Sequence, residues 1–187
     1  LETIRAAIWL SDMRGFTARA DRMPGRDLID LLNRYYDCQV PAIRAEGGEV
    51  LKFMGDGLLA IFPTESAGAE AASVCRRALN AAREAEAKVA DGDWGGLESP
   101  GAVRFGVALH FGDVLYGNIG SADRLDFTCI GPAVNLAARI EALTAETGRT
   151  ILASEDFAQH CADEKLSPLG AFALKGVAAR QTVYGPD

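Results

Sequence analysis

The fold of this chain is decided by residues 6–17, which read AAIWLSDMRGFT. The apolar run at its start is typical of a buried strand. It ends abruptly in a carboxylate, Asp12, and a glycine, Gly15. A strand that carries an aspartate to its own end and then turns through glycine can hold a metal ion beside backbone N–H groups. We therefore predict a metal site at this turn.

A partner carboxylate is expected, because one aspartate rarely holds Mg²⁺ well enough for chemistry. Residues 50–62 read VLKFMGDGLLAIF, with Gly-Asp-Gly between two apolar runs. This pattern predicts a β-hairpin with Asp56 at its tip. Either aspartate alone is as readily a turn residue. If the hairpin joins the sheet of the Asp12 strand, however, the pair can hold two metal ions about 3.5–4 Å apart.

Composition limits the class of protein. The 187 residues fit one domain, 1–187, with 49% hydrophobic and 24% charged residues. The net charge of −7 and the lack of a basic stripe argue against a nucleic-acid partner. The four cysteines include no C-x-x-C pair, so neither a zinc site nor a disulfide framework is indicated, and a reducing cytosol fits best.

Targeting signals are also missing from the sequence. No apolar run reaches the ~18–20 residues of a membrane span, and no signal peptide opens the chain. We predict a cytoplasmic fragment without membrane contact of its own. Because residue 1 is leucine, we expect a piece of a longer protein with a regulatory domain elsewhere, and a membrane anchor in that parent stays open.

The remaining pattern predicts the order of elements. We expect, in sequence, a helix over 26–45 that Pro41 kinks or ends, a hairpin over 49–63, a helix over 66–90, a loop over 91–101, a strand over 103–109 with further strands punctuated by Gly112 and Gly117, a helix over 131–147, a strand over 151–153, a short helix over 155–161, and a closing hairpin of 171–174 with 181–184. Recurring hairpins without regular βαβ repeats predict an α+β, or loosely α/β, fold with a mixed, largely antiparallel sheet and flanking helices.

Three polar residues outside the turns are candidates for a functional site. His110, at the end of the strand predicted over 103–109, is more typical of a hydrogen-bonded structural residue than of a catalyst. Asn135 and Arg139 fall at i and i+4 on one face of the helix over 131–147. Their spacing fits either two groups that reach one ligand or a surface pair.

Five blocks in order carry a resemblance to a known family. They are LSDMRGFT at 10–17, LKFMGDG at 51–57, RFGVALHFG at 104–112, IGPAVNLAAR at 130–139 and LKG at 174–176. Together they resemble the catalytic domain of class III nucleotidyl cyclases over nearly the whole chain. The resemblance implies a ferredoxin-like βαββαβ core with a C-terminal αβ extension.

The resemblance also implies roles for individual residues. Two Mg²⁺ or Mn²⁺ ions per site are expected on Asp12 and Asp56, with the backbone carbonyl of Met13 as a further ligand. Phosphates are expected at the backbone N–H groups of the Gly15-Phe16-Thr17 turn and at the side chains of Arg104 and Lys175. Asn135 is expected to position the ribose, and Arg139 to stabilise the pentavalent phosphorus.

Base choice rests on the positions of Lys52 and Thr128. Lys52 is a donor and suits the N1 acceptor of adenine, whereas guanine calls for an acidic group. A threonine at 128 resembles the bacterial and soluble-cyclase subclass, and its hydroxyl can accept from the adenine amino group. The departures are Pro132, for a usual Asn or Asp, and Ser11, for a small apolar residue; neither removes a reacting group.

The expected activity is that of an adenylyl cyclase, which converts ATP to 3′,5′-cyclic AMP and pyrophosphate in a homodimer with shared active sites. Two alternatives stay open, a guanylyl cyclase and a catalytically silent module that dimerises or binds nucleotide. Completeness of the site residues disfavours the silent module. A diguanylate cyclase and a P-loop NTPase are disfavoured because neither GGDEF nor GxxxxGK[ST] occurs.

Overall fold

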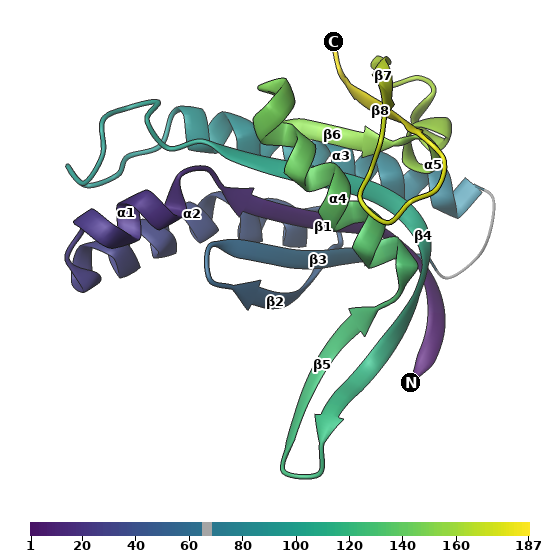
Figure 1. Cartoon of the computed structure of the whole chain (residues 1–187), viewed down its shortest axis with the longest axis horizontal. Helices are drawn as coiled ribbons and strands as arrows, with labels where there is room; N and C mark the ends of the chain where they lie inside the picture. Colours follow the sequence, from purple (N-terminus) through teal and green to yellow (C-terminus); the bar gives the residue numbers. More distant parts are fainter. Residues whose placement is uncertain (65–68) are drawn as a thin grey trace.

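The computed structural model describes residues 1–64 and 69–187, which form a mixed α+β domain (Figure 1). The strands are β1 (Glu2–Met13), β2 (Glu49–Met54), β3 (Gly57–Pro63), β4 (Phe105–Ser121), β5 (Arg124–Ile130), β6 (Ile151–Ser154), β7 (Leu166–Phe172) and β8 (Gln181–Pro186). The helices are α1 (Phe16–Arg22), α2 (Gly25–Ala45), α3 (Ala69–Ala90), α4 (Pro132–Thr147) and α5 (Glu155–Ala158), with a 3₁₀ turn at Gln159–Cys161. No helix in these ranges is long and apolar enough to cross a membrane.

The strands form one sheet in the order β2-β3-β1-β4-β6-β8-β7, and β5 pairs with β4 off this path. The first four strands in that order are the ferredoxin-like βαββαβ core, and the others form the C-terminal extension. All pairings are antiparallel except β4 with β6. The predicted mixed, largely antiparallel sheet is therefore confirmed.

The strand β1 lies inside the sheet and is buried on both faces. Ala7 and Trp9 pack against the cluster that includes residues of α2 and α3. Ala6, Ile8 and Leu10 pack on the opposite face, toward α4. Figure 1 shows α4 on one side of the sheet and α2 and α3 on the other. Burial on both sides explains why the run at 6–10 is continuously apolar, and it fixes the strand that ends in Asp12.

The predicted strand over 103–109 is wrong in extent, because β4 continues through Gly112 and Gly117 as one strand of 17 residues. Its first part pairs with β1 and its end pairs with β5. Pairing with these two strands keeps the backbone extended at Gly112 and at Gly117. The hairpin of β4 and β5 extends away from the rest of the domain (Figure 1). This hairpin and the strand β5 were not predicted.

His110 consequently lies within β4 and not at a strand end. Its ring is buried, and Nδ1 is 2.6 Å from Oγ of Ser154. Desolvation lowers the pKa of His110, which favours the neutral ring. The predicted hydrogen-bonded structural role agrees with these contacts.

Other boundaries shift in smaller ways. The helix α2 continues past Pro41 to Ala45. The predicted start of the next helix at Ser66 lies outside the described residues. The closing hairpin exists, but its first strand is Leu166–Phe172, so residues 174–176 belong to the connection.

Candidate active site

The structure brings the two predicted metal aspartates together. Asp12 at the end of β1 pairs with Gly57 on β3, and Asp56 precedes that glycine in the turn between β2 and β3. The turn uses Gly55 with φ +64°, a conformation that glycine adopts without strain. The backbone N–H of Met13 donates to Oδ2 of Asp56 at 3.2 Å. The end of β1 is thereby tied to the hairpin tip.

The helix α2 braces the same turn. The hydroxyl of Tyr36 lies 3.1 Å from the carbonyl oxygen of Gly57 and also contacts that of Gly55. Desolvation, together with the charges of Asp56 and Asp12, raises the pKa of Tyr36 to about 12. The phenol therefore stays protonated and keeps its donor at neutral pH.

The two carboxylates repel each other when no cation is between them. Burial, followed by the hydrogen bond with Asp56 and the charges of Asp56 and Glu141, raises the pKa of Asp12 from 3.8 to about 8. Oδ1 of Asp12 is buried without a protein partner. An unpaired carboxylate oxygen beside a second carboxylate is a donor set that suits a hard divalent cation such as Mg²⁺.

The site fits a cation that keeps other ligands. Within residues 1–64 and 69–187, no cluster of three or more His, Cys, Asp or Glu side chains could hold a metal. Mg²⁺ is commonly held by one or two carboxylates plus substrate phosphates, so the carboxylates of Asp12 and Asp56 are enough protein ligands for it. The carbonyl of Met13, next to Asp12, is the further ligand that the family resemblance implies.

The turn predicted to bind phosphates, residues 15–17, lies shortly after Asp12 in the sequence. Gly15 has φ +70° and precedes α1, whose N-terminus has no side-chain cap and no acidic residue in its first turn. The N–H groups at the start of a helix lack intrahelical partners, so those of Phe16 and Thr17 are suited to an anion. Arg104, immediately before β4, accepts the N–H of Arg14 on its carbonyl oxygen at 2.9 Å.

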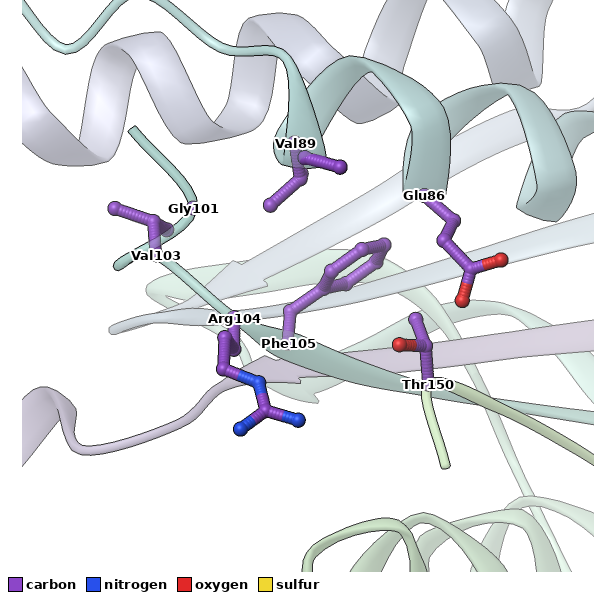
Figure 2. Close-up of a pocket in the computed structure, with 8 residues that line it drawn as sticks. Glu86, Val89, Gly101, Val103, Arg104, Phe105 and Thr150 are labelled. Atoms are coloured by element: carbon purple, nitrogen blue, oxygen red, sulfur yellow. The ribbon is translucent and has the colours of Figure 1, made fainter. Parts of the chain in front are cut away.

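A buried arginine on α1 holds this turn in place. Arg19 donates to the carbonyl oxygens of Arg14 at 2.6 Å and Ala102 at 3.0 Å, and to the Glu98 carboxylate at 2.9 Å. Arg19 thus joins the phosphate turn to the predicted loop over 91–101, which leads into Arg104. Figure 2 shows Arg104 pointing away from Phe105, beside a pocket of about 170 Å³ at the end of α3.

The two predicted base-binding residues line one pocket. Lys52 on β2 and Thr128 on β5 both border a cavity of about 350 Å³ between these strands. Asp126, which the sequence reasoning missed, borders it as well. Residues two apart on a strand face the same side, so a predicted strand over 124–130 would have revealed Asp126 beside Thr128.

The remaining predicted residues form a third group on α4 and the loop after β7. The Arg139 guanidinium donates to the carbonyl oxygen of Lys175 and, at 3.3 Å, to that of Asn135. Gly176 has φ +78°, and a Cβ there would lie 3.1 Å from Arg139. The side chains of Asn135 and Lys175 are exposed. This group can therefore reach a ligand outside its own chain.

A sequence model described as the adenylate and guanylate cyclase catalytic domain matches residues 2–184. The chain belongs to this family. The match covers nearly all of this cyclase domain, including every predicted site residue. The resemblance inferred from the five sequence blocks is confirmed.

Both nucleotide classes occur among the relatives of this cyclase domain. It is 32% identical over 187 residues to an adenylate cyclase of Anabaena cylindrica, and this alignment covers 99% of this chain and 35% of that protein. The adenylyl cyclase CyaB from P. aeruginosa has a TM-score of 0.79 at 28% identity, over 98% of this chain and 95% of that one. A solved guanylyl cyclase has a TM-score of 0.73 at 27% identity, over 98% and 91%. The chain spans about a third or less of the length of the first curated relatives it matches.

The helix α4 of this cyclase domain presents Glu141 and Arg139 to different sides. Glu141, another residue that the sequence reasoning missed, is half-buried near Asp12 and Asp56, and burial and the charge of Asp56 raise its pKa. Arg139 is two residues earlier, or about 200° around the helix axis at 3.6 residues per turn. When Glu141 faces the aspartates of its own chain, Arg139 therefore points away from them.

Proposed function

We propose that this domain is an adenylyl cyclase that converts ATP to 3′,5′-cyclic AMP and pyrophosphate as a homodimer with two shared sites. The observation that carries the proposal is the Asp12–Asp56 pair, with its unpaired buried oxygen, beside a phosphate-binding turn. Mg²⁺ or Mn²⁺ held there would polarise the α-phosphate and acidify the attacking 3′-hydroxyl.

The other site residues bind the base, the phosphates and the ribose of ATP and stabilise the transition state. Lys52 donates to N1 of adenine, and the hydroxyl of Thr128 accepts from the amino group. The N–H groups of residues 15–17, with Arg104 and Lys175, bind the phosphates. Asn135 holds the ribose so that the 3′-oxygen is in line with the α-phosphorus. Arg139 donates to the oxygens on which charge develops in the transition state.

A second chain is needed because α4 turns Arg139 away from the metal aspartates of its own chain. A two-fold axis would bring Asn135, Arg139 and Lys175 of one chain to Asp12 and Asp56 of the other, and would do so twice. Exposed apolar side chains provide a surface for such a partner on the hairpin of β4 and β5. They are Leu115, Leu125, Phe127 and Ile130, each more than 40% exposed.

Complementation tests the shared site. Asp56→Asn removes one metal ligand, and Arg139→Ala removes the transition-state donor, so each homodimer should be inactive. In a mixture, one site of each heterodimer carries neither change, and activity should return. If subunit exchange is demonstrated by mass spectrometry and the mixture stays inactive, the shared-site arrangement is wrong.

A guanylyl cyclase is the second candidate, and Asp126 favours it. Its carboxylate borders the base pocket and can accept from the N1–H and N2–H₂ donors of guanine. Lys52 in the same pocket favours adenine. Parallel assays with ATP and GTP in Mn²⁺ decide between them, and equal or greater turnover of GTP would overturn the choice of ATP.

A further inference from the structure

The side chain of Arg14 reaches from the metal-binding turn to the C-terminal end of α4. Its Nη2 donates to the carbonyl oxygen of Thr144 at 2.8 Å and also to that of Arg149. Thr144 lies in the last turn of α4, and Arg149 follows its C-cap, Gly148. The last carbonyls of a helix lack intrahelical donors, and a guanidinium satisfies them while also opposing the helix dipole.

The helix α4 has no cation of its own for this purpose. Its last turn contains no basic residue, so the positive charge comes from Arg14, 130 positions earlier in the chain. Nε of Arg14 is buried without a partner. The guanidinium is therefore held mainly by the carbonyl oxygens of Thr144 and Arg149. These hydrogen bonds connect the C-terminal end of α4 to the turn that follows Asp12.

The packing beneath α4 makes this connection rigid. Thr144 is buried and lies directly over Gly106, where an added Cβ would come within 1.9 Å of Oγ1 of Thr144. Gly106 is the β4 partner of Asp12. The last turn of α4 is thus seated next to the strand position that carries the metal ligand.

Arg14 is also fixed on the side of the metal turn. Its N–H donates to the carbonyl oxygen of Arg104, and its own carbonyl oxygen accepts from Arg19 at 2.6 Å. Only Met13 separates it from Asp12. A displacement of the turn, for example when Asp12 and Asp56 close on a cation, must therefore move the Arg14 side chain or break its bonds to α4.

We propose that Arg14 is a positioning residue that joins the metal-binding turn of each chain to α4 and thereby couples the two active sites of the homodimer. This inference rests on the proposed function, in which Asp12 and Asp56 serve one site while Asn135 and Arg139 of the same chain serve the other. Occupation of one site by metal is then transmitted through Arg14 to the helix that completes the second site.

The complementing pair of variants separates a role of Arg14 in the metal turn of its own chain from its positioning of α4. In the active site of the heterodimer, the Arg139→Ala chain supplies the aspartates, and the Asp56→Asn chain supplies α4. Arg14→Met is added to the Asp56→Asn chain alone, so the metal turn of the working site is unchanged. We expect kcat to fall about tenfold or more with KM for ATP within about threefold. Arg26→Met on the same chain, which removes an exposed arginine at the start of α2, is the matched control and should change neither constant.

Hydrogen exchange gives a readout that depends on neither activity nor dimerisation. The amides of residues 143–149 should exchange about tenfold faster in Arg14→Met than in the unchanged domain, whereas those of β1 and α2 should not change. Mn²⁺ should slow exchange of the same amides in the unchanged domain but not in Arg14→Met. Arg14→Lys keeps the charge but not the two-carbonyl geometry, and its rates should be intermediate.

The outcomes distinguish the inference from the function on which it rests. If Asp56→Asn and Arg139→Ala fail to complement each other, the shared site is wrong, and unchanged exchange of residues 143–149 would still refute the attachment of α4 by Arg14. If complementation succeeds and Arg14→Met on the chain that supplies α4 leaves kcat unchanged, the positioning of α4 by Arg14 is refuted. If Mn²⁺ slows exchange of residues 143–149 equally in Arg14→Met and in the unchanged domain, the coupling is refuted.

Discussion

Replacing Asp56 with asparagine should abolish activity yet stabilise the metal-free protein at high pH. In the unchanged domain the pKa of Asp12 is raised to about 8, and after burial the largest causes are the hydrogen bond and charge of Asp56. An unfolded aspartate ionises near pH 3.9, so unfolding releases a proton from Asp12 between about pH 4 and 8. Stability from this group is therefore present at low pH and is lost as pH rises through that window.

The magnitude follows from the size of the shift and the exposure of the group. About four pKa units would correspond to ~6 kcal/mol for a fully buried group, at ~1.4 kcal/mol per unit. Asp12 is only about half-buried, so solvent screening reduces this to roughly 2–3 kcal/mol. Asp56→Asn removes the contribution of Asp56 but not the burial, and it should return about 1–2 kcal/mol. For a domain of this size, that raises Tm by about 3–6 °C.

Calorimetry in EDTA at pH 8.5 and pH 5 tests this reasoning. The gain from Asp56→Asn should be largest at pH 8.5 and small at pH 5, where Asp12 is protonated in both proteins. Mn²⁺ should raise the Tm of the unchanged domain much more than that of the variant. A lower Tm for Asp56→Asn at pH 8.5 in EDTA, or an equal response to Mn²⁺, would refute the assignment of the pair as a cation site.

Four further substitutions test other parts of the site. Lys52→Glu should lower kcat/KM for ATP at least tenfold relative to GTP in paired assays, and an unchanged ratio would remove Lys52 from base recognition. Arg139→Ala should lower kcat about 10²–10³-fold with little change in KM for ATP, whereas a change in KM alone would indicate a binding role. Glu98→Gln should cost roughly 2–3 kcal/mol in urea unfolding, because it leaves the buried Arg19 without its carboxylate; a loss under 0.5 kcal/mol would contradict this account. Leu125→Asp should leave the circular dichroism spectrum unchanged but convert dimer to monomer in ultracentrifugation, with loss of activity, and a stable dimer would exclude this surface.

The sequence was sufficient where a local pattern determines the structure. The apolar run before Asp12 and the Gly-Asp-Gly turn at 55–57 carry their own signals, so both aspartates were placed at the ends of the correct elements. Asp12 and Asp56 lie close together because β1 and the hairpin of β2 and β3 belong to one sheet. Asn135 and Arg139 were placed on one helix face by their spacing alone, and the contact of Arg139 with the Asn135 carbonyl oxygen agrees with it.

The errors arise where distant pairing overrides a local pattern. Gly112 and Gly117 were interpreted as strand ends, but β1 and β5 pair with β4 on either side of them and keep it extended. The consequence was that Asp126 was not seen beside Thr128. Arg14 and Glu141 had no local signal at all, since their roles depend on contacts between β1 and α4, which are far apart in the sequence.

The charge distribution explains how an acidic domain can bind a polyanion. The net charge of −7 gives no general attraction for a triphosphate. In one chain, the proposed metal ligands Asp12 and Asp56 also interact through their charges with the carboxylate of Glu141. Lys52 borders the base pocket, and Arg139 and Lys175 lie together on another surface. In the proposed dimer, these cations would meet the proposed metal ligands only when two chains associate. A single chain would then offer a triphosphate only Arg104 and the N–H groups of residues 15–17, so the substrate itself should favour the dimer, and ATP with Mn²⁺ should tighten association measured at equilibrium.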